Sequence, residues 1–228
     1  MVANHHASRN APRLSLRPLP RAFYQRSADL VARDLLGRWV VRDFGDEKLI
    51  LRIVETEAYL GVSDRASHAW AGRRTARNEA MYLGGGHAYV YFIYGMHFCL
   101  NVVTGATETP QAVLLRAGEP VDGASRMAEL RGLEGRVRDG AIAGGPGRLC
   151  RALAIDRELN AAKFWHQPLR LAAGEPVQDR VVARGPRVGV DYAGEATAWP
   201  LRFAVRGNRH VSKPWPWPAA RRVEATNA

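Results

Sequence analysis

Two carboxylates lie in an apolar run of this sequence, where an ionised side chain needs a counter-charge or a role in catalysis. The run RIVETEAYLG, residues 52–61, carries Glu55 and Glu57 among residues typical of a buried strand. Side chains of a strand alternate between its two faces. By this alternation one face carries the odd-numbered residues Leu49, Leu51, Ile53, Glu55, Glu57 and Tyr59. Because a buried charge is costly unless it is paired or used, the two glutamates are the first candidates for catalysis.

Arg116 is the natural counter-charge for Glu57. It follows Ala112 and Leu114 on one face of the strand-like run QAVLLRA, so its side chain also points in the direction of apolar residues. A carboxylate beside a guanidinium stays ionised at neutral pH, as a general base must. Such a pair could position one water molecule. Taken alone, however, a glutamate near a strand end is more often a salt-bridge partner than a catalyst.

Aromatic and imidazole side chains crowd into the same part of the sequence. The group comprises Tyr59, His68, Tyr89, Tyr91 and Tyr94. Aromatic clusters usually belong to a core, but buried hydroxyl and imidazole groups also need polar partners. Proteins that stack planar bases use surfaces of this composition. The cluster is therefore either core or a base-binding wall.

The tripeptide Tyr94-Gly95-Met96 separates two β-rich runs in HAYVYFIYGMHFCLNVV. This pattern predicts a hairpin with an exposed tyrosine at its tip. The tip is either an ordinary turn or a wedge that enters between stacked bases of a duplex. Further along, Gly145-Pro146-Gly147 opens a predicted helix beside Arg148, which is either a plain helix start or a phosphate site.

The charge balance favours a polyanionic partner. Lys and Arg number 33 against 22 Asp and Glu, a net charge of +11, and the pI is near 10.4. Nucleic acid fits this balance better than an anionic membrane surface. No run of eighteen apolar residues occurs, and the first residues lack the apolar segment of a secretory signal. We therefore expect an intracellular protein, in the cytoplasm of a prokaryote or the nucleus of a eukaryote. Cys99 and Cys150 fit no zinc pattern and read as reduced core residues.

The 228 residues suit one well-cored domain. Residues 1–26 contain five arginines and no acid, and prolines interrupt any helix there. They predict a flexible basic tail, with an organellar transit peptide as the alternative. The folded domain is expected over residues 27–213, followed by a C-terminal tail over residues 214–228.

Helix and strand signals alternate without a regular βαβ rhythm. Helices are predicted from a Ser27 cap to Gly37, and over residues 119–132 and 147–154, with a surface loop and short helix over 64–82. Strands are predicted over residues 38–43, 48–58, the two arms of the hairpin, 111–116, 187–191 and 200–206. This mixture predicts an α+β domain around a curved, largely antiparallel sheet, with a protruding β-hairpin and surrounding helices.

With these residues together, the sequence resembles the alkyladenine DNA glycosylase family, also called methylpurine or 3-methyladenine DNA glycosylases of the eukaryotic type. The resemblance runs from about Leu35 to Ser212. Its most specific motifs are RIVETEAYLG at 52–61, TARNEAM at 75–81, YVYFIYGMHFCLNV at 89–102, AVLLRAGEP at 112–120, GPGRLCRALAI at 145–155 and RVGV at 187–190. The loop Gly84–His87, the pair Asp191-Tyr192 and the end KPWPWP depart from the family pattern.

The resemblance implies an enzyme that flips a damaged purine out of duplex DNA and hydrolyses its N-glycosidic bond. Glu57 matches the general base that activates water, Arg116 the arginine that helps hold that water, and the carbonyl of Val188 a third water contact. The base-binding residues of the family fall on Tyr59, His68 and Tyr91. Asn101 matches the asparagine that disfavours guanine. Tyr94 falls on the intercalating tyrosine, with Met96 beside it.

The resemblance also implies a monofunctional glycosylase of base excision repair. Strand-cutting glycosylases use an amine nucleophile, and none of Lys48, Lys163 and Lys213 lies in the aromatic cluster. No cofactor and no metal are expected. The expected partner is double-stranded DNA containing damaged purines, bound by a monomer without a membrane. The alternatives are a non-catalytic nucleic-acid binding protein that stacks bases on its tyrosines, and a purely structural basic protein.

Overall fold

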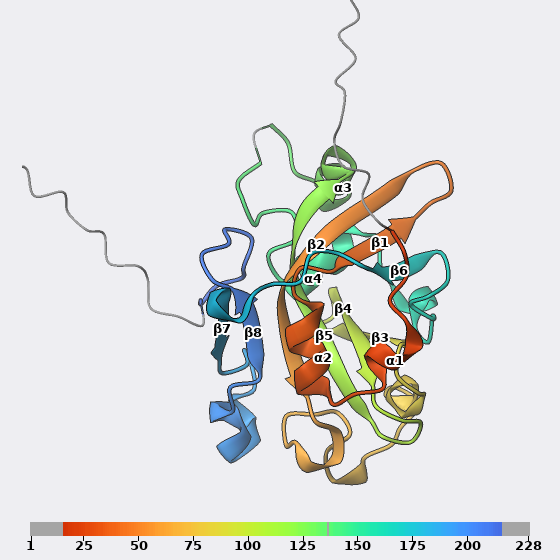
Figure 1. Ribbon diagram of the computed structural model, residues 1–228, viewed down its shortest axis with the longest axis vertical. Helices are drawn as coiled ribbons and strands as arrows, with labels where there is room; N and C mark the ends of the chain where they lie inside the picture. Colours follow the sequence, from red (N-terminus) through yellow and green to blue (C-terminus); the bar gives the residue numbers. More distant parts are fainter. Residues whose placement is uncertain (1–15, 136, 216–228) are drawn as a thin grey trace, which may run out of the picture.

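The computed structural model describes residues 16–135 and 137–215, which fold around one curled antiparallel sheet of eight strands (Figure 1). The strands are β1 (Trp39–Asp43), β2 (Lys48–Tyr59), β3 (Ala88–Ile93), β4 (His97–Thr104), β5 (Gln111–Asp122), β6 (Leu169–Ala172), β7 (Val182–Gly185) and β8 (Arg202–Val205). Their order is β3-β4-β5-β2-β1-β6, and β8 joins β2 to β7. The predicted α+β class, with its curved antiparallel sheet, is confirmed.

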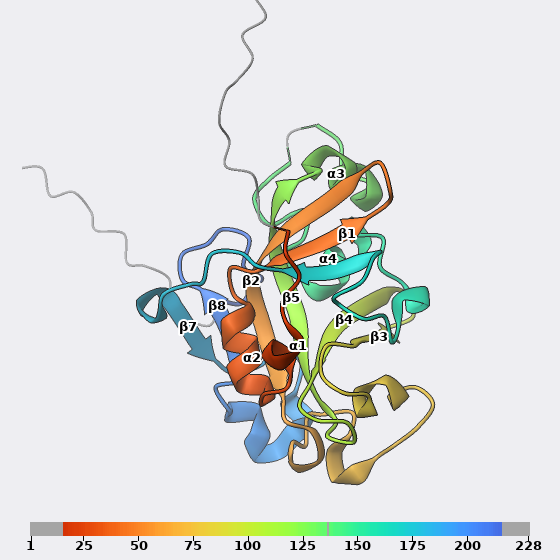
Figure 2. The ribbon, with the colours of Figure 1, turned by 45° about the vertical axis from the view of Figure 1, so that its right-hand side comes forward.

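Short helices surround this sheet. The α-helices of the described part are α1 (Arg21–Tyr24), α2 (Ala28–Leu35), α3 (Ala124–Arg131) and α4 (Pro146–Ala152). Its 3-10 helices are η1 (Gly61–Ser63), η2 (Trp70–Gly72), η3 (Glu79–Tyr82), η4 (Arg157–Leu159), η5 (Asp179–Val181) and η6 (Asp191–Ala198). Figure 2 shows α2 lying across β2 and β5. None of the helices described is long and apolar enough to cross a membrane.

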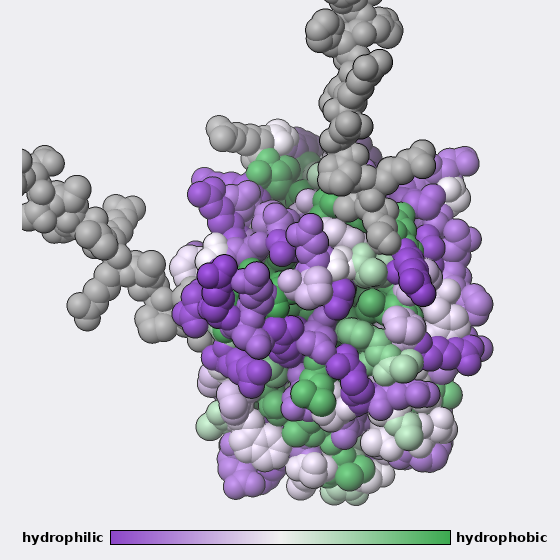
Figure 3. Space-filling view, in the orientation of Figure 1, coloured by the Kyte–Doolittle hydropathy of each residue, from purple (hydrophilic) through white to green (hydrophobic). Residues whose placement is uncertain are grey.

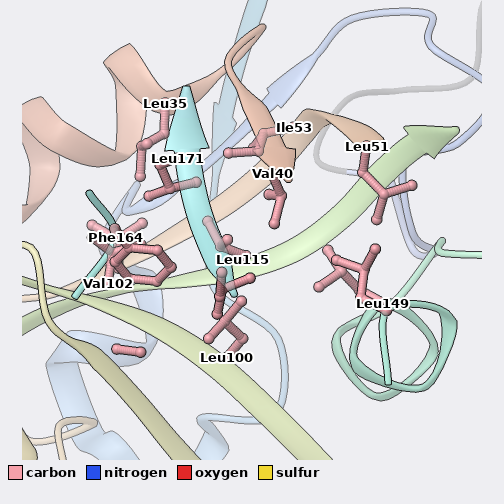
Figure 4. Close-up of a cluster of buried hydrophobic side chains, with 14 of the residues drawn as sticks. Leu35, Val40, Leu51, Ile53, Leu100, Val102, Leu115, Leu149, Phe164 and Leu171 are labelled. Carbon is pink, nitrogen blue, oxygen red and sulfur yellow. The ribbon is translucent and has the colours of Figure 1, made fainter. Parts of the chain in front are cut away.

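The main core fills the space between the sheet and the helices α2 and α4. It includes Leu35 of α2, Leu149 of α4 and Leu171 of β6, all fully buried (Figure 4). Each such side chain contributes about 1.5 to 3 kcal/mol by leaving water. The face that carries α2 is largely hydrophilic with scattered apolar patches (Figure 3). This core fixes the strands whose opposite faces carry the polar groups described below.

A β-bulge in β2 reverses the expected alternation of its side chains. The pairing of β2 with β5 shifts between Ile53 and Glu55. Ile53 belongs to the main core, and Thr56 also faces it, because its hydroxyl donates to the carbonyl of Ala32 in α2 at 2.8 Å. The prediction that all the odd-numbered residues share one face is therefore wrong. Leu49, Leu51 and Ile53 face the core, whereas Glu55, Glu57 and Tyr59 point to the other side of the sheet.

Several predicted boundaries also change. Strand β5 does not end at Arg116 but continues to Asp122, because its second half pairs with β2 as far as Ile50. The helix predicted over residues 119–132 therefore begins only at Ala124, after Gly123 turns the chain with a φ of 73°. Residues 187–191 form no strand. The strands β6 and β7 were not predicted.

The expected tail boundary at residue 26 falls within packed structure. Leu19 is 5% exposed and Tyr24 fully buried, and Pro18 forms a bridge with Ala172, the last residue of β6. Residues 16–26 are therefore part of the fold, because Leu19 and Tyr24 belong to the main core. Residues 1–15 of the predicted tail and residues 216–228 of the predicted C-terminal tail lie outside the described residues.

Candidate active site

A cavity of about 430 Å³ lies on the side of the sheet that faces away from α2. Strands β2 to β5 supply one wall, and the loop before η2, the N-terminus of α4 and residues 188–192 supply the others. All four residues predicted to bind the base line it, namely Tyr59, His68, Tyr91 and Asn101. Arg116, Val188 and Tyr94 also line it. Met96 lies at the hairpin tip beside Tyr94 and is 68% exposed.

Glu57 is fully buried behind this wall and is held by three residues that line the cavity. Its Oε1 accepts a hydrogen bond from the backbone N–H of Val188 at 2.8 Å and lies 3.2 Å from Nη1 of Arg116. Its Oε2 accepts from the hydroxyl of Tyr59 at 2.9 Å. The predicted pair of Glu57 and Arg116 is confirmed. A carboxylate has about four acceptor positions, so Oε2 keeps one for a further donor.

Glu55 has a different environment, which the sequence did not reveal. Its Oε1 accepts from Nε of Arg116 at 3.0 Å, Nε of Arg202 at 2.7 Å and the hydroxyl of Ser212 at 3.0 Å. Its Oε2 accepts from the backbone N–H of Ser212 at 2.7 Å. Four protein hydrogen bonds therefore hold this carboxylate, and of the three residues that donate them only Arg116 lines the cavity. These partners assign Glu55 to the framework, whereas the three residues that hold Glu57 all line the cavity, so Glu57 remains the candidate base.

Arg116 bridges the two carboxylates. Its Nη2 donates to the hydroxyl of Ser212 at 3.3 Å, while Nε contacts Glu55 and Nη1 contacts Glu57. Burial alone lowers the pKa of this guanidinium, but the adjacent charges of Glu57 and Glu55 outweigh it and raise the pKa of Arg116. The guanidinium therefore stays charged, and its fork fixes the direction of the Glu57 carboxylate.

Tyrosine and histidine rings form the apolar wall of the cavity. The ring of Tyr91 lies 4.7 Å from the ring of His68 in an edge-on arrangement and 5.3 Å from the ring of Tyr89. Burial, followed by the charge of Glu57, raises the pKa of Tyr59 well above its ordinary value. Burial likewise raises the pKa of Tyr91. Both hydroxyl groups therefore remain protonated donors at neutral pH.

Asn101 presents a defined end of its amide to the cavity. It is 3% exposed, and its Nδ2 donates to the carbonyl of Tyr89 at 3.0 Å. A carbonyl can only accept, so the amide nitrogen must face the backbone of the hairpin. The carbonyl oxygen of Asn101 is therefore the end that remains for the cavity.

His68 is held neutral in this wall. Its Nδ1 lies 2.8 Å from the hydroxyl of Tyr89. Burial, with smaller contributions from Arg77 and Arg73, lowers the pKa of His68 from 6.5 to about 4. At neutral pH the imidazole is therefore uncharged and adds no positive charge to the cavity.

This shift predicts acid sensitivity that depends on His68. Because the folded pKa lies below the unfolded value of 6.5, the unfolded chain binds the extra proton first as the pH falls, and stability is lost between about pH 6.5 and pH 4. Between pH 7 and pH 5 this group should remove about 1 to 2 kcal/mol of unfolding free energy. Urea unfolding of the wild type and of His68→Gln at both pH values measures it. An equal loss in both proteins contradicts the assignment.

The hairpin tip carries Tyr94 far into solvent. Tyr94 is 79% exposed and has a φ of 53°, and Gly95 after it has a φ of 67°. Two successive residues with positive φ are typical of a tight hairpin turn, in which tyrosine is strained and glycine is not. The side chain still lines the cavity mouth. The turn therefore holds an exposed aromatic ring at the entrance at some conformational cost.

Three further residues of the site were not predicted. Asp64 and Arg187 form a fully buried ion pair next to Tyr59 and Val188. Tyr192, 64% exposed, lines the mouth from η6. A signal for Tyr192 was its departure from the family pattern, but no local pattern joins Asp64 to a residue so far along the chain.

Gly145 and Arg148, at the start of α4, also line the cavity. Among the described residues no group of three or more His, Cys, Asp or Glu side chains could hold a metal ion.

Comparisons with known proteins agree over most of the chain. A family model described as methylpurine-DNA glycosylase matches residues 22–209. Relatives carry the name "Putative 3-methyladenine DNA glycosylase". One from Myxococcus xanthus is 48% identical over 195 residues, which cover 86% of this chain and 93% of the relative. One from Desulfitobacterium hafniense is 44% identical over 202 residues, covering 86% and 99%. One from Methanocella arvoryzae is 48% identical over 195 residues, covering 86% and 96%. This chain therefore belongs to the methylpurine-DNA glycosylase family.

Proposed function

We propose that this protein is a monofunctional DNA glycosylase that excises alkylated or deaminated purines of the 3-methyladenine, hypoxanthine and ethenoadenine class from double-stranded DNA. The observation that carries the proposal is the position of Glu57. It is fully buried against a tyrosine-lined cavity, held by three donors, and keeps one acceptor position on Oε2. A purine turned out of the duplex into this cavity would bring its sugar toward that carboxylate.

The proposed reaction is hydrolysis at the sugar. A water molecule gives a proton to Glu57 while its oxygen bonds to C1′ and the N-glycosidic bond breaks, so that the purine leaves with the bonding electron pair. Positive charge develops on the sugar as the base departs, and the anionic Glu57 stabilises that charge. Arg116 and the carbonyl of Val188 would hold the water in line. Among the described residues that line the cavity none is a lysine, which favours hydrolysis over an amine-linked intermediate.

The walls of the cavity suit electron-poor purines. Alkylated bases are flat and often cationic, and they stack strongly on the faces of tyrosines such as Tyr59 and Tyr91. The neutral imidazole of His68 adds no repulsion toward such a base. Asn101 would lie at the edge of the purine, where the family resemblance implies that it leaves no room for the exocyclic amino group of guanine. Damaged bases also pair weakly, so they cost less to extrude.

A panel of duplex oligonucleotides, each with one modified purine, tests the proposal. Abasic-site formation is measured under single-turnover conditions in EDTA, with an undamaged duplex as the control. We expect excision of at least one of 3-methyladenine, hypoxanthine and ethenoadenine without strand cleavage. Salt-sensitive DNA binding without release of any of these bases would contradict the proposal and support a non-catalytic binding protein.

Tyr94 is proposed to fill the space that the flipped nucleotide leaves, with Met96 beside it. Replacement of Tyr94 by glycine should raise the unfolding free energy by up to about 1 kcal/mol, because the left-handed turn strains tyrosine. The same change should slow excision from duplex DNA about tenfold, since nothing then offsets the loss of stacking.

Two controls separate the wedge from a general defect. Tyr94→Phe keeps the ring and the backbone strain and should excise at nearly the wild-type rate. Excision from single-stranded DNA needs no wedge and should be similar in all three proteins. If Tyr94→Gly excises from duplex DNA as fast as the wild type, Tyr94 is an ordinary turn residue.

A further inference from the structure

The buried ion pair of Asp64 and Arg187 is the most extensively bonded feature near the cavity that the proposed reaction does not use. Both side chains are completely buried. The guanidinium of Arg187 donates to the carboxylate of Asp64 from both of its terminal nitrogens, with Nη2 2.8 Å from Oδ1. Nη1 also donates to the carbonyl of Ala58 at 2.9 Å, and Nη2 to that of Ala196 at 3.3 Å. One arginine thus ties together β2, the loop after it and η6.

Asp64 in turn fixes the loop that follows β2. Its Oδ2 accepts from the backbone N–H of Leu60 and its Oδ1 from that of Ala66, each at 3.0 Å. Ala66 begins the segment that brings His68 to the cavity. The carboxylate therefore sets the path of the chain between two walls of the cavity.

Arg187 touches two of the three residues that hold Glu57. Its guanidinium lies over the ring of Tyr59, 4.7 Å from the ring centroid. Val188 follows it directly, and the N–H of Val188 donates to Oε1 of Glu57. The third residue, Arg116, is fixed separately by Glu55. The candidate base is thus held from two sides, by the Glu55 network and by the Asp64–Arg187 pair.

Stability alone does not account for this pair. The attraction within a buried ion pair offsets little more than the cost of desolvating it, and replacement of both partners by apolar residues often leaves the unfolding free energy unchanged. Geometry is the better explanation, because planar two-pronged pairing fixes direction as well as distance. We propose that Asp64 and Arg187 are positioning residues that orient Tyr59 and Val188 so that the Glu57 carboxylate faces the sugar. This inference rests on the proposed glycosylase function.

The double variant Asp64→Asn/Arg187→Met tests the proposal without leaving an unpaired buried charge. Asparagine can still accept from Leu60 or Ala66, and methionine fills the space of the arginine stem. We expect DNA affinity within about threefold of the wild type and a single-turnover excision rate about 100-fold lower, as small misplacements of a catalytic group produce. The matched control is Asp43→Asn/Arg170→Met, which removes an ion pair on β1 and β6, away from the cavity. This control should excise at the wild-type rate.

A double-mutant cycle with Tyr59→Phe distinguishes positioning from a general structural role. If Arg187 acts through Tyr59, loss of the Tyr59 hydroxyl should cost clearly less in the double variant than in the wild type. The proposal is overturned if Tyr59→Phe slows excision equally in the wild type and in Asp64→Asn/Arg187→Met. It is also overturned if Asp64→Asn/Arg187→Met itself excises within threefold of the wild-type rate.

A crystal structure of the double variant gives a readout that does not depend on activity. We expect Glu57 to lose its contact with the N–H of Val188 or with the hydroxyl of Tyr59. Retention of both contacts overturns the inference, whatever the enzyme excises. Failure of the wild type to release any damaged base would instead overturn the proposed function, so the two failures are distinguishable.

Discussion

Replacement of Glu57 by glutamine is expected to lower the single-turnover rate of base excision by between about 100-fold and 10,000-fold, the range that a general base supplies. Glutamine has nearly the same shape, so it fills the same site. Its single carbonyl oxygen can still accept from Val188 and Arg116, and the hydroxyl of Tyr59 can turn to accept from the new amide group. The variant should therefore fold, but it has no basic oxygen left to take a proton from water.

The measurement compares excision and binding on the same lesion duplex. Affinity should stay within about threefold of the wild type, because phosphate contacts from the basic surface supply most of the binding free energy. Glu119→Gln is a suitable control, since this partly exposed side chain lies on β5 beside Arg52 and away from the cavity. An excision rate for Glu57→Gln within tenfold of the wild type would mean that another group activates the water.

The sequence was most informative where an inference needs only the alternation of side chains along a strand and the cost of a buried charge. Alternation along β3 places Tyr89 and Tyr91 on one face, and their rings do lie 5.3 Å apart. A charged residue at the end of an apolar strand needs a partner, which led from Glu57 to Arg116. Both inferences use only local geometry and the cost of a buried charge, so they need no knowledge of how strands are ordered.

The failures share a different cause, which is pairing between distant segments. The bulge in β2 arises where that strand pairs with β5 on one side and β8 on the other, and it turns Glu55 and Glu57 away from the core. The second half of β5 contains Gly118 and Pro120, which are poor strand formers, yet pairing with β2 keeps it extended. Neither effect leaves a signal in the local sequence.

The framework of the site was missed for the same reason. The hydrogen-bonded residues Arg187 and Asp64 are 123 residues apart in the sequence, and Arg202 and Glu55 are 147 residues apart. From alternation alone, Glu55 and Glu57 are equivalent, since both are acidic residues on one face of a strand. Only the surrounding donors distinguish them, and apart from Tyr59 on β2 itself these come from β5, β8 and the loops beyond.

The second large effect follows from that difference. Replacement of Glu55 by glutamine is expected to lower the unfolding free energy by about 3 to 5 kcal/mol, because it leaves the buried guanidinium of Arg202 without its counter-charge and that of Arg116 with Glu57 alone. For a chain of this size the melting temperature should fall by roughly 10 °C. Thermal unfolding of Glu55→Gln, Glu57→Gln and the Glu119→Gln control measures this, and an unchanged melting temperature for Glu55→Gln contradicts it.

Excision by Glu55→Gln then shows which carboxylate does the chemistry. Four groups donate to Glu55, and two of the three residues that supply them, Arg202 and Ser212, do not line the cavity, whereas all three residues that hold Glu57 line it. At a temperature where Glu55→Gln is still folded, it should therefore excise much faster than Glu57→Gln, with a loss that reflects only the loosened Arg116. If a fully folded Glu55→Gln is as inactive as Glu57→Gln, the roles assigned to the two glutamates are wrong.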